Sequence, residues 1–282
     1  MAITYHAGRR IQGLSTELDP SNSLYDDFTS SGSTSHTADN TTVGGWTTSN
    51  YLKCKVNGTD DRLDLNLSAV SGELTGAVYD LQQILGSGNY VSTQFILRFK
   101  YHINTSVDSN QHACYFGLSS ANQTAYYNTA QDYIGVTLSD QVAGNSVYVR
   151  YGNNDTWTGS NYGNINSTPT WTSNTDYWFE IKNDGTNITM KIFSDEYVTQ
   201  IGSTSTVANG FTGNLRYIKF VTYNGGTGGT HDVYVDDLYF YDNTSTIPSG
   251  YKPTNVQSGS RFEETDTQKI YYWNGSTWTE EV

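Results

Sequence analysis

The segment Asp176–Asp195, DYWFEIKNDGTNITMKIFSD, decides the fold. Apolar and polar residues alternate over Tyr177–Lys182 and again over Ile188–Phe193, which places successive side chains on opposite faces of a strand. The two runs are joined around Asn183–Gly185 (NDG), and an Asp-Gly pair tolerates the positive φ that a tight turn needs. The segment therefore predicts a β-hairpin with one buried face.

A second strand signal lies at Asp232–Asp242, DVYVDDLYFYD, where the alternation slips by one residue at Asp236-Asp237. Such a slip indicates a β-bulge or a strand end. Similar runs recur about every dozen residues between Gly, Asn and Asp turns, a spacing typical of a two-sheet sandwich. The fold class predicted is all-β, and Ala77–Leu85, with apolar spacing near the helical period, is the candidate helix.

The composition supports strands and excludes two classes of function. The 282 residues include 23 Tyr and 27 Gly, with 15% charged residues and a net charge of −13. An acidic surface repels phosphate, so a nucleic-acid partner is not expected. No stretch approaches the ~18 apolar residues of a membrane span, so membrane insertion is not expected either.

The cysteines and the N-terminal residues bear on the compartment. Cys54 and Cys114 lack the spacing of a zinc site, and a disulfide and two buried thiols both remain open. The start, MAITYHAGRRIQGLST, has no apolar core of a signal peptide, so export by the standard route is not expected.

The chain divides into three predicted parts: an arm (residues 1–18), a body (19–243) and a tail (244–282). In the tail, Ile270–Trp273 and Thr277–Thr279 flank Asn274-Gly275, a strong hairpin signal, and Arg261–Glu263 offers a third strand. A three-stranded meander of this size is marginal alone. We therefore expect the tail to pack on the arm or on a neighbouring subunit.

The body resembles the concanavalin A-like (laminin G/lectin-glucanase) jelly roll. The resemblance rests on Tyr25–Phe28, on Trp178 with the hairpin that follows it, and on Val233–Asp242 as the closing strand. It implies a jelly-roll β-sandwich, and it says little about function because this fold serves many.

The two ends carry a second resemblance. Ile3–Gly13 and Pro253–Glu281 are similar to terminal segments of tail- and capsid-associated structural proteins of phages and archaeal viruses. This implies a non-enzymatic virion structural protein (capsid, decoration, tail or fibre), made in the host cytoplasm and present as a homo-oligomer beside other virion proteins. Arginine forks and aromatic rings are favoured at interface centres, so the predicted assembly contacts are Arg9, Arg10, Tyr271, Trp273 and Trp278.

The sequence predicts two ligands, a glycan and a calcium ion. Sugars stack on exposed rings, so the predicted glycan-binding residues, here for a host-surface glycan, are the aromatics of polar loops, Tyr126, Tyr127, Trp157, Tyr162 and Trp171. The jelly-roll resemblance implies a structural calcium, for which carboxylates of the first and last strands are the natural ligands, Asp26, Asp27, Asp236 and Asp237.

Enzymatic motifs are missing from the sequence. Retaining glucanases of this fold carry a strand-borne Glu-x-Asp-x-x-Glu array, whereas Glu180 stands alone on its strand and Glu263-Glu264 point to opposite faces. There is no nucleophile elbow and no phosphate-binding loop. Besides the virion role, three alternatives stay open: a lectin-like module for host attachment, a cell-surface coat or filament subunit, and a polysaccharide hydrolase.

Overall fold

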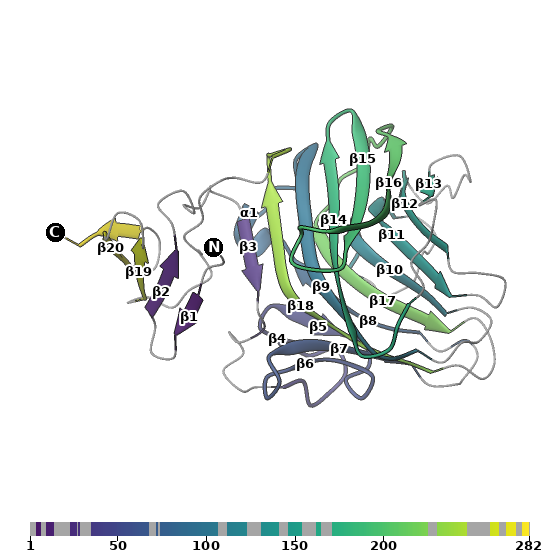
Figure 1. Cartoon of the computed structure of the whole chain (residues 1–282), viewed down its shortest axis with the longest axis horizontal. Helices are drawn as coiled ribbons and strands as arrows, with labels where there is room; N and C mark the ends of the chain where they lie inside the picture. The colour runs from purple at the N-terminus through teal and green to yellow at the C-terminus, as the bar shows by residue number, and fades with distance from the viewer. Residues whose placement is uncertain are drawn as a thin grey trace.

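In the computed structural model, the structure describes residues 4–6, 10–13, 23–26, 28, 35–67, 72, 74–106, 112–122, 131–140, 146–153, 162–164, 171–224, 230–246, 260–264, 269–274 and 278–281. Within these residues nearly all regular structure is β-strand, and the helix is the single turn α1 (Gln82–Leu85). Figure 1 shows a large sandwich of two sheets with a small sheet beside it.

The first large sheet, here called the back sheet, contains the hairpin that opened the sequence analysis. Its strands pair antiparallel, and β3 pairs with β18 off the main path. In sheet order the strands are β16 (Gln200–Ala208), β15 (Asn187–Phe193), β14 (Thr175–Asp184), β9 (Gln94–Ser106), β18 (His231–Asp242), β7 (Arg62–Leu67) and β6 (Cys54–Asn57), with β3 (Ser23–Asp26) on β18.

The second large sheet, here called the front sheet, is also antiparallel and packs face to face with the first. Its strands in order are β13 (Tyr162–Asn164), β12 (Ser146–Gly152), β11 (Tyr133–Asp140), β10 (His112–Ser119), β17 (Tyr217–Asn224), β8 (Leu74–Asp80), β5 (Trp46–Thr48) and β4 (Thr42–Val43). The two sheets confirm the predicted all-β jelly-roll sandwich.

Two local predictions are confirmed by backbone geometry. The β14–β15 hairpin pairs Asn183 with Ile188, and Gly185 takes a φ of 90°. The register of β18 against β9 shifts between Asp236 and Tyr239, and Asp237 has a φ of 46°. The slip in the sequence pattern is therefore a β-bulge.

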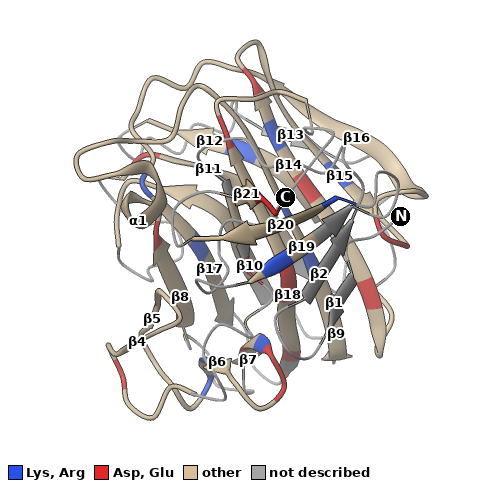
Figure 2. Cartoon of the chain, turned by 90° about the vertical axis from the view of Figure 1, so that its left-hand side faces the viewer, with Lys and Arg blue, Asp and Glu red and all other residues tan. Residues whose placement is uncertain are grey.

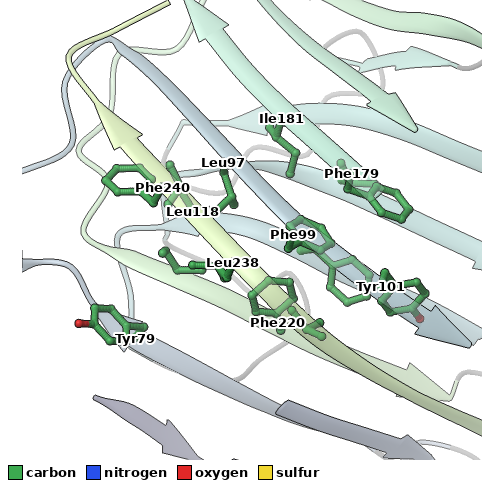
Figure 3. Close-up of a cluster of buried hydrophobic side chains, with 14 of the residues drawn as sticks. Tyr79, Leu97, Phe99, Tyr101, Leu118, Phe179, Ile181, Phe220, Leu238 and Phe240 are labelled. Carbon is green, nitrogen blue, oxygen red and sulfur yellow. The ribbon is translucent and has the colours of Figure 1, made fainter. Parts of the chain in front are cut away.

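The core between the sheets combines phenylalanine rings with leucine, isoleucine and valine side chains (Figure 3). Phe99 stacks on Phe179 of the neighbouring strand, with 5.2 Å between centroids, and meets Phe220 of the opposite sheet edge-on at 5.0 Å. Each such ring contributes about 2–3 kcal/mol by leaving water. Trp46, predicted to lie in the core, is buried there, and its indole Nε1 donates a 2.7 Å hydrogen bond to Asp26.

Three expectations need correction. The candidate helix Ala77–Leu85 is helical only in its second half: residues 77–80 belong to β8, and Gln82–Leu85 form α1. Trp178, expected in the core, is half-buried on the outer face of β14, because Tyr177 and Phe179 on either side of it point inward. Strand β16 was not predicted, because its exposed Ser and Thr side chains carry no apolar alternation.

The ends of the chain form a sheet of their own. Its strands are β1 (Thr4–His6), β2 (Arg10–Gly13), β19 (Arg261–Glu264), β20 (Ile270–Trp273) and β21 (Trp278–Glu280). β2 pairs in parallel with β19, so the first and last segments of the chain are joined. The predicted contact of Trp273 with Trp278 across the hairpin is confirmed, with 5.5 Å between ring centroids.

Two further observations concern the cysteines and membrane insertion. Cys54 is a buried free thiol. Among the residues that the structure describes, none forms a helix with the length and apolarity that a membrane span requires.

Candidate functional site

The outer face of the front sheet is unusual because its polar side chains are buried. In β10, Phe116 and Leu118 point into the core, so Tyr115, Gly117 and Ser119 lie on the outer face. An outer face normally meets water, yet this one includes buried polar or charged residues on four neighbouring strands and beside them: Ser119, Gln131, Thr137, Arg150 and Lys219. Figure 2 shows these strands side by side.

Glycines on this face make room for tyrosine rings. A Cβ added to Gly135 would lie 3.0 Å from the hydroxyl of Tyr115, and one added to Gly152 would overlap the ring of Tyr133. The two rings meet edge-on with 5.6 Å between centroids. The tyrosines therefore lie flat against the sheet, and any larger residue at the glycines would lift them.

Lys219 lies in the same row as Gly117, Gly135 and Arg150, which pair across successive strands. Its side chain is 0% exposed, and its Nζ donates a 3.1 Å hydrogen bond to Oε1 of Gln131. Burial lowers the pKa of Lys219 to about 8. In the described part of the chain no Asp or Glu pairs with this amine.

The neighbouring side chains are held by aromatic and polar contacts. The guanidinium of Arg150 lies 4.5 Å above the ring of Tyr148, and the Tyr115 hydroxyl donates to the carbonyl of Leu118 at 2.9 Å. Ser119 Oγ donates to the same Gln131 Oε1 at 2.8 Å. These contacts fix the amide of Gln131 between a hydroxyl and an ammonium group.

A pocket of about 310 Å³ opens on the outer face of the front sheet beside Lys219. Val78, the cross-strand neighbour of Lys219, lines this pocket, and so does Tyr217, which lies two residues before Lys219 on β17. The described residues that line it are Thr42, Gly45, Thr47, Val78, Asp80, Gln83, Asn122, Arg216 and Tyr217.

The charged groups of the pocket are held in one orientation. Arg216 binds Asp80 through two nitrogens, at 2.9 Å from Nε and 2.5 Å from the second, and the backbone N–H of Gln82 donates to the same carboxylate. These hydrogen bonds to Arg216 hold the pKa of Asp80 below its usual range. The Arg216 guanidinium also lies 4.9 Å from the ring of Tyr217.

This lining suits a polyhydroxylated ligand. It combines an oriented carboxylate and guanidinium, the amides of Gln83 and Asn122, threonine hydroxyls and the ring of Tyr217. Sugars bind through hydrogen bonds to such groups and through stacking of their apolar face on a ring. The volume lies at the lower end of the range for small-ligand pockets, about 300–1,000 Å³.

The structure places the predicted glycan residues at several positions. Tyr162 begins β13, the edge strand of the front sheet, opposite Arg150. Trp171 is half-buried and meets Tyr177 edge-on at 4.9 Å. Trp157, Tyr126 and Tyr127 lie outside the described residues, the last two between Asn122 and Gln131 in the sequence. All five assignments stay predictions.

The predicted calcium ligands already take part in other interactions. The carboxylate of Asp26 accepts hydrogen bonds from Trp46 Nε1 and from the backbone N–H of Phe28, at 2.7 and 2.8 Å. Lys100 Nζ lies 2.7 Å from Asp236 and 3.6 Å from Asp237, while Asp27 lies outside the described residues. Over the described ranges no three His, Cys, Asp or Glu side chains gather as metal ligands. A calcium site therefore stays a prediction.

The predicted assembly residues belong to the terminal sheet. Arg10 begins β2, and Arg9 lies outside the described residues. Trp273 is buried in this sheet, whereas Tyr271 and Trp278 are half-buried. On the back sheet, Glu180, the isolated carboxylate of the sequence analysis, is paired with Arg98 at 2.8 Å from Nε.

Sequence reasoning missed Lys219 and the pocket. One signal was available: in Tyr217–Asn224, YIKFVTYN, alternation places a lysine on the same face as Tyr217, Val221 and Tyr223. The pocket itself joins residues from the β4–β5 hairpin, β8, α1, the segment after β10 and the start of β17. No local sequence pattern predicts that these residues lie together in one pocket.

Comparisons with known proteins show the fold. No protein-family model matches this sequence, and no curated protein matches it. The exoplasmic/lumenal domain of VIP36, in its Ca²⁺/Man3GlcNAc-bound form, is 6% identical with a TM-score of 0.54, over 83% of this chain and 96% of that chain.

Two other solved structures are similar. The legume lectin-like domain from Entamoeba histolytica is 14% identical, with a TM-score of 0.44, over 65% of this chain and 84% of that chain. The alginate lyase from Klebsiella pneumoniae is 10% identical, with a TM-score of 0.42, over 66% and 82%. The similarity to the VIP36 domain, with its TM-score of 0.54, shows the fold alone, a lectin-like β-sandwich, and a shared fold does not determine function.

Proposed function

We propose that the chain is a lectin-like carbohydrate-binding module and that its front-sheet pocket holds the sugar. The observation that carries the proposal is the pocket lining, in which Asp80, Gln83, Asn122 and Arg216 surround a cavity beside the ring of Tyr217. The similarity to a VIP36 domain solved in a mannose-containing glycan-bound form supports it at the level of the fold.

Each group has a part in binding. The ring of Tyr217 provides the surface on which the apolar face of a sugar ring packs. Asp80, held by Arg216, accepts hydrogen bonds from sugar hydroxyls, while the amides of Gln83 and Asn122 donate and accept them. Because Asp80 and Arg216 are oriented before the ligand arrives, these two side chains lose little conformational entropy on binding.

Binding without turnover fits the carboxylates of this site. Glycoside hydrolysis needs two carboxyl groups about 5–9.5 Å apart. Among the described residues that line the pocket, Asp80 is the one carboxylate, and it is paired with Arg216. The ligand that suits such a module is a glycan on a host or cell surface.

The terminal sheet favours a second role, attachment of the sandwich to a larger assembly such as a virion. The observation behind it is the parallel pairing of β2 with β19, which joins both ends of the chain around the inserted sandwich. In this role many copies of the chain display their front sheets, and repeated weak glycan contacts add up to tight attachment. Structural calcium in the sandwich would be compatible with both roles.

The test is glycan binding by pocket variants. We expect the full-length protein to bind glycans on an array, and Tyr217→Ala and Asn122→Ala to weaken binding about tenfold or more, since each removes a direct contact. Tyr272→Ala, at an exposed tyrosine of the terminal sheet, is the matched control and should bind as the wild type does. Normal binding by Tyr217→Ala, or release of reducing ends from the bound glycan, would overturn the proposal.

A further inference from the structure

The buried amine of Lys219 is linked to the pocket wall by a chain of hydrogen bonds. Lys219 Nζ donates to Gln131 Oε1 at 3.1 Å, and Ser119 Oγ donates to the same oxygen at 2.8 Å. The backbone N–H of Ala121 donates to Ser119 Oγ at 3.2 Å, and the next residue, Asn122, lines the pocket. The amine is therefore connected to one end of the pocket through Gln131 and Ser119.

No acidic side chain of the described residues pairs with this amine. Among the described residues its hydrogen-bond acceptor is the neutral amide of Gln131, and its aromatic neighbour is Tyr115, whose ring centroid lies 6.0 Å away. Burying an ammonium group without a counter-ion costs several kcal/mol, so such a group usually has a carboxylate partner or gives way to an apolar residue. A negatively charged ligand would supply this missing counter-charge.

Among the described residues that line the pocket, the charged groups balance, because Asp80 and Arg216 bind each other and leave no net charge. Lys219, behind the wall, is cationic and buried. The chain as a whole carries −13, so this positive charge contrasts with its surroundings and is weakly screened because it is buried.

We propose that the pocket selects a sugar that bears a carboxylate, and that Lys219 provides the positive charge for this selection. The inference rests on the proposed function, because it specifies the ligand of the same pocket. We place the carboxylate of the sugar at the end of the pocket formed by Asn122, which the hydrogen bonds through Gln131 and Ser119 link to the charge of Lys219. The charge of Lys219 adds no affinity for a neutral sugar.

Matched pairs of glycans test the proposal. Trigalacturonate is compared with its carboxyl-reduced form, and 3′-sialyllactose with lactose, by titration calorimetry at pH 6.5. In at least one pair we expect the wild type to bind the acidic member about tenfold more tightly or better, as a buried charge contact allows. The pair that shows the preference identifies the source of the carboxylate, a uronic or a sialic acid.

Two variants then test whether the charge of Lys219 causes the preference for the acidic glycan. Lys219→Gln should bind both members of the pair equally, whereas Lys191→Gln, which removes a half-exposed lysine of the back sheet, should keep the preference. Gln131→Glu is the second variant: its carboxylate can accept the same hydrogen bonds from Ser119 and Lys219, and it supplies the missing counter-charge internally. It should abolish the preference even if Lys219→Gln does not fold.

The outcomes separate this inference from the proposed function. Wild-type binding of acidic and neutral members with equal affinity overturns the inference and leaves the carbohydrate-binding module standing. A preference for the acid that survives in both Lys219→Gln and Gln131→Glu also overturns it. If no glycan binds at all, the proposed function fails and the inference fails with it.

Discussion

At the scale of single residues, a buried lysine and a half-buried lysine have opposite effects on stability. Burial lowers the pKa of Lys219 to about 8. Burial also opposes the charged form of Lys100, but the hydrogen bond to Asp236 and the charges of Asp236 and Asp237 outweigh it and raise the pKa of Lys100 to about 12. The same chemical group therefore destabilises the fold at one position and stabilises it at the other.

We predict that Lys219→Met stabilises the protein at pH 7. Between about pH 8 and 10.5 the unfolded chain holds the proton of this residue and the folded chain does not, so wild-type stability rises with pH there. Below pH 8 the charged amine costs about 3 kcal/mol. After loss of the Gln131 hydrogen bond, the variant should gain about 2 kcal/mol at pH 7, a gain that shrinks as the pH rises to 10.

Urea unfolding at pH 7, 8.5 and 10 measures this difference, with Lys100→Met as the control. The folded pKa of Lys100 lies above its unfolded value, so its contribution is fully present below about pH 10.5. That variant should lose about 2 kcal/mol, nearly constant from pH 7 to 9.5. A Lys219→Met protein that is less stable than the wild type at pH 7 would contradict the account.

Some residue environments can be predicted from the sequence and others depend on distant partners. Alternation alone places Tyr177 and Phe179 inside, and it should have placed Trp178 outside. His36 is buried, and its ring forms hydrogen bonds with the carbonyls of Thr41 and Trp46 and with the N–H of Val56. Trp46 and Val56 belong to β5 and β6, so apolar alternation around His36 does not indicate its burial.

At the scale of elements, the bulge in β18 has a specific backbone requirement. Asp237 takes a φ of 46°, in the left-handed region that Asn, Asp and Gly tolerate and β-branched residues do not. We predict that Asp237→Val destabilises the fold by about 1–3 kcal/mol, because the strain acts within a strand paired on both sides. Thermal unfolding followed by circular dichroism measures the loss.

Asp237→Asn is the matched control for this strain. It removes the charge near Lys100 but keeps a side chain suited to the left-handed region. Its stability should stay within about 0.5 kcal/mol of the wild type, the range of an ordinary surface change. Equal losses for the Val and Asn variants would show that the charge, not the backbone, matters at this position.

Elements with strong local signals could be predicted, and those defined by pairing could not. The turns at Asn183–Gly185 and at Asn274 carry residues that only tight hairpins favour, and both hairpins form. β16 is a strand because it pairs with β15, although its Ser and Thr side chains have no apolar pattern. The first residues of the expected helix at Ala77–Leu85 belong to β8 for the same reason, since they pair with β5 and β17.

At the scale of the whole molecule, the order of strands lies beyond what sequence patterns show. β9 pairs with β14 and β18, which follow it much later in the chain, and the front-sheet pocket depends on such long-range pairings. The jelly-roll resemblance predicted the two-sheet architecture but no strand order, and periodicity shows strands without showing which strands pair. The front-sheet pocket could therefore not be located from the sequence.

The joining of both chain ends in one sheet leads to the last prediction, that this sheet drives assembly. Phe262 is fully buried in β19, with its ring 6.1 Å from that of Trp278, so Phe262→Asp places a carboxylate in the apolar centre of the terminal sheet. Such a change costs more than about 3 kcal/mol and should unfold this small sheet alone. Static light scattering should then show a monomer where the wild type is an oligomer.

The sandwich should be unaffected, because Trp46 and the phenylalanine core lie in other sheets. Its melting temperature and its glycan affinity should match those of the wild type, while the emission of Trp273 and Trp278 shifts to the red. Tyr272→Asp, at an exposed position of β20, is the control and should stay oligomeric. A wild-type chain that is already monomeric would remove assembly from the functions of this sheet and leave carbohydrate binding as the role that the structure supports.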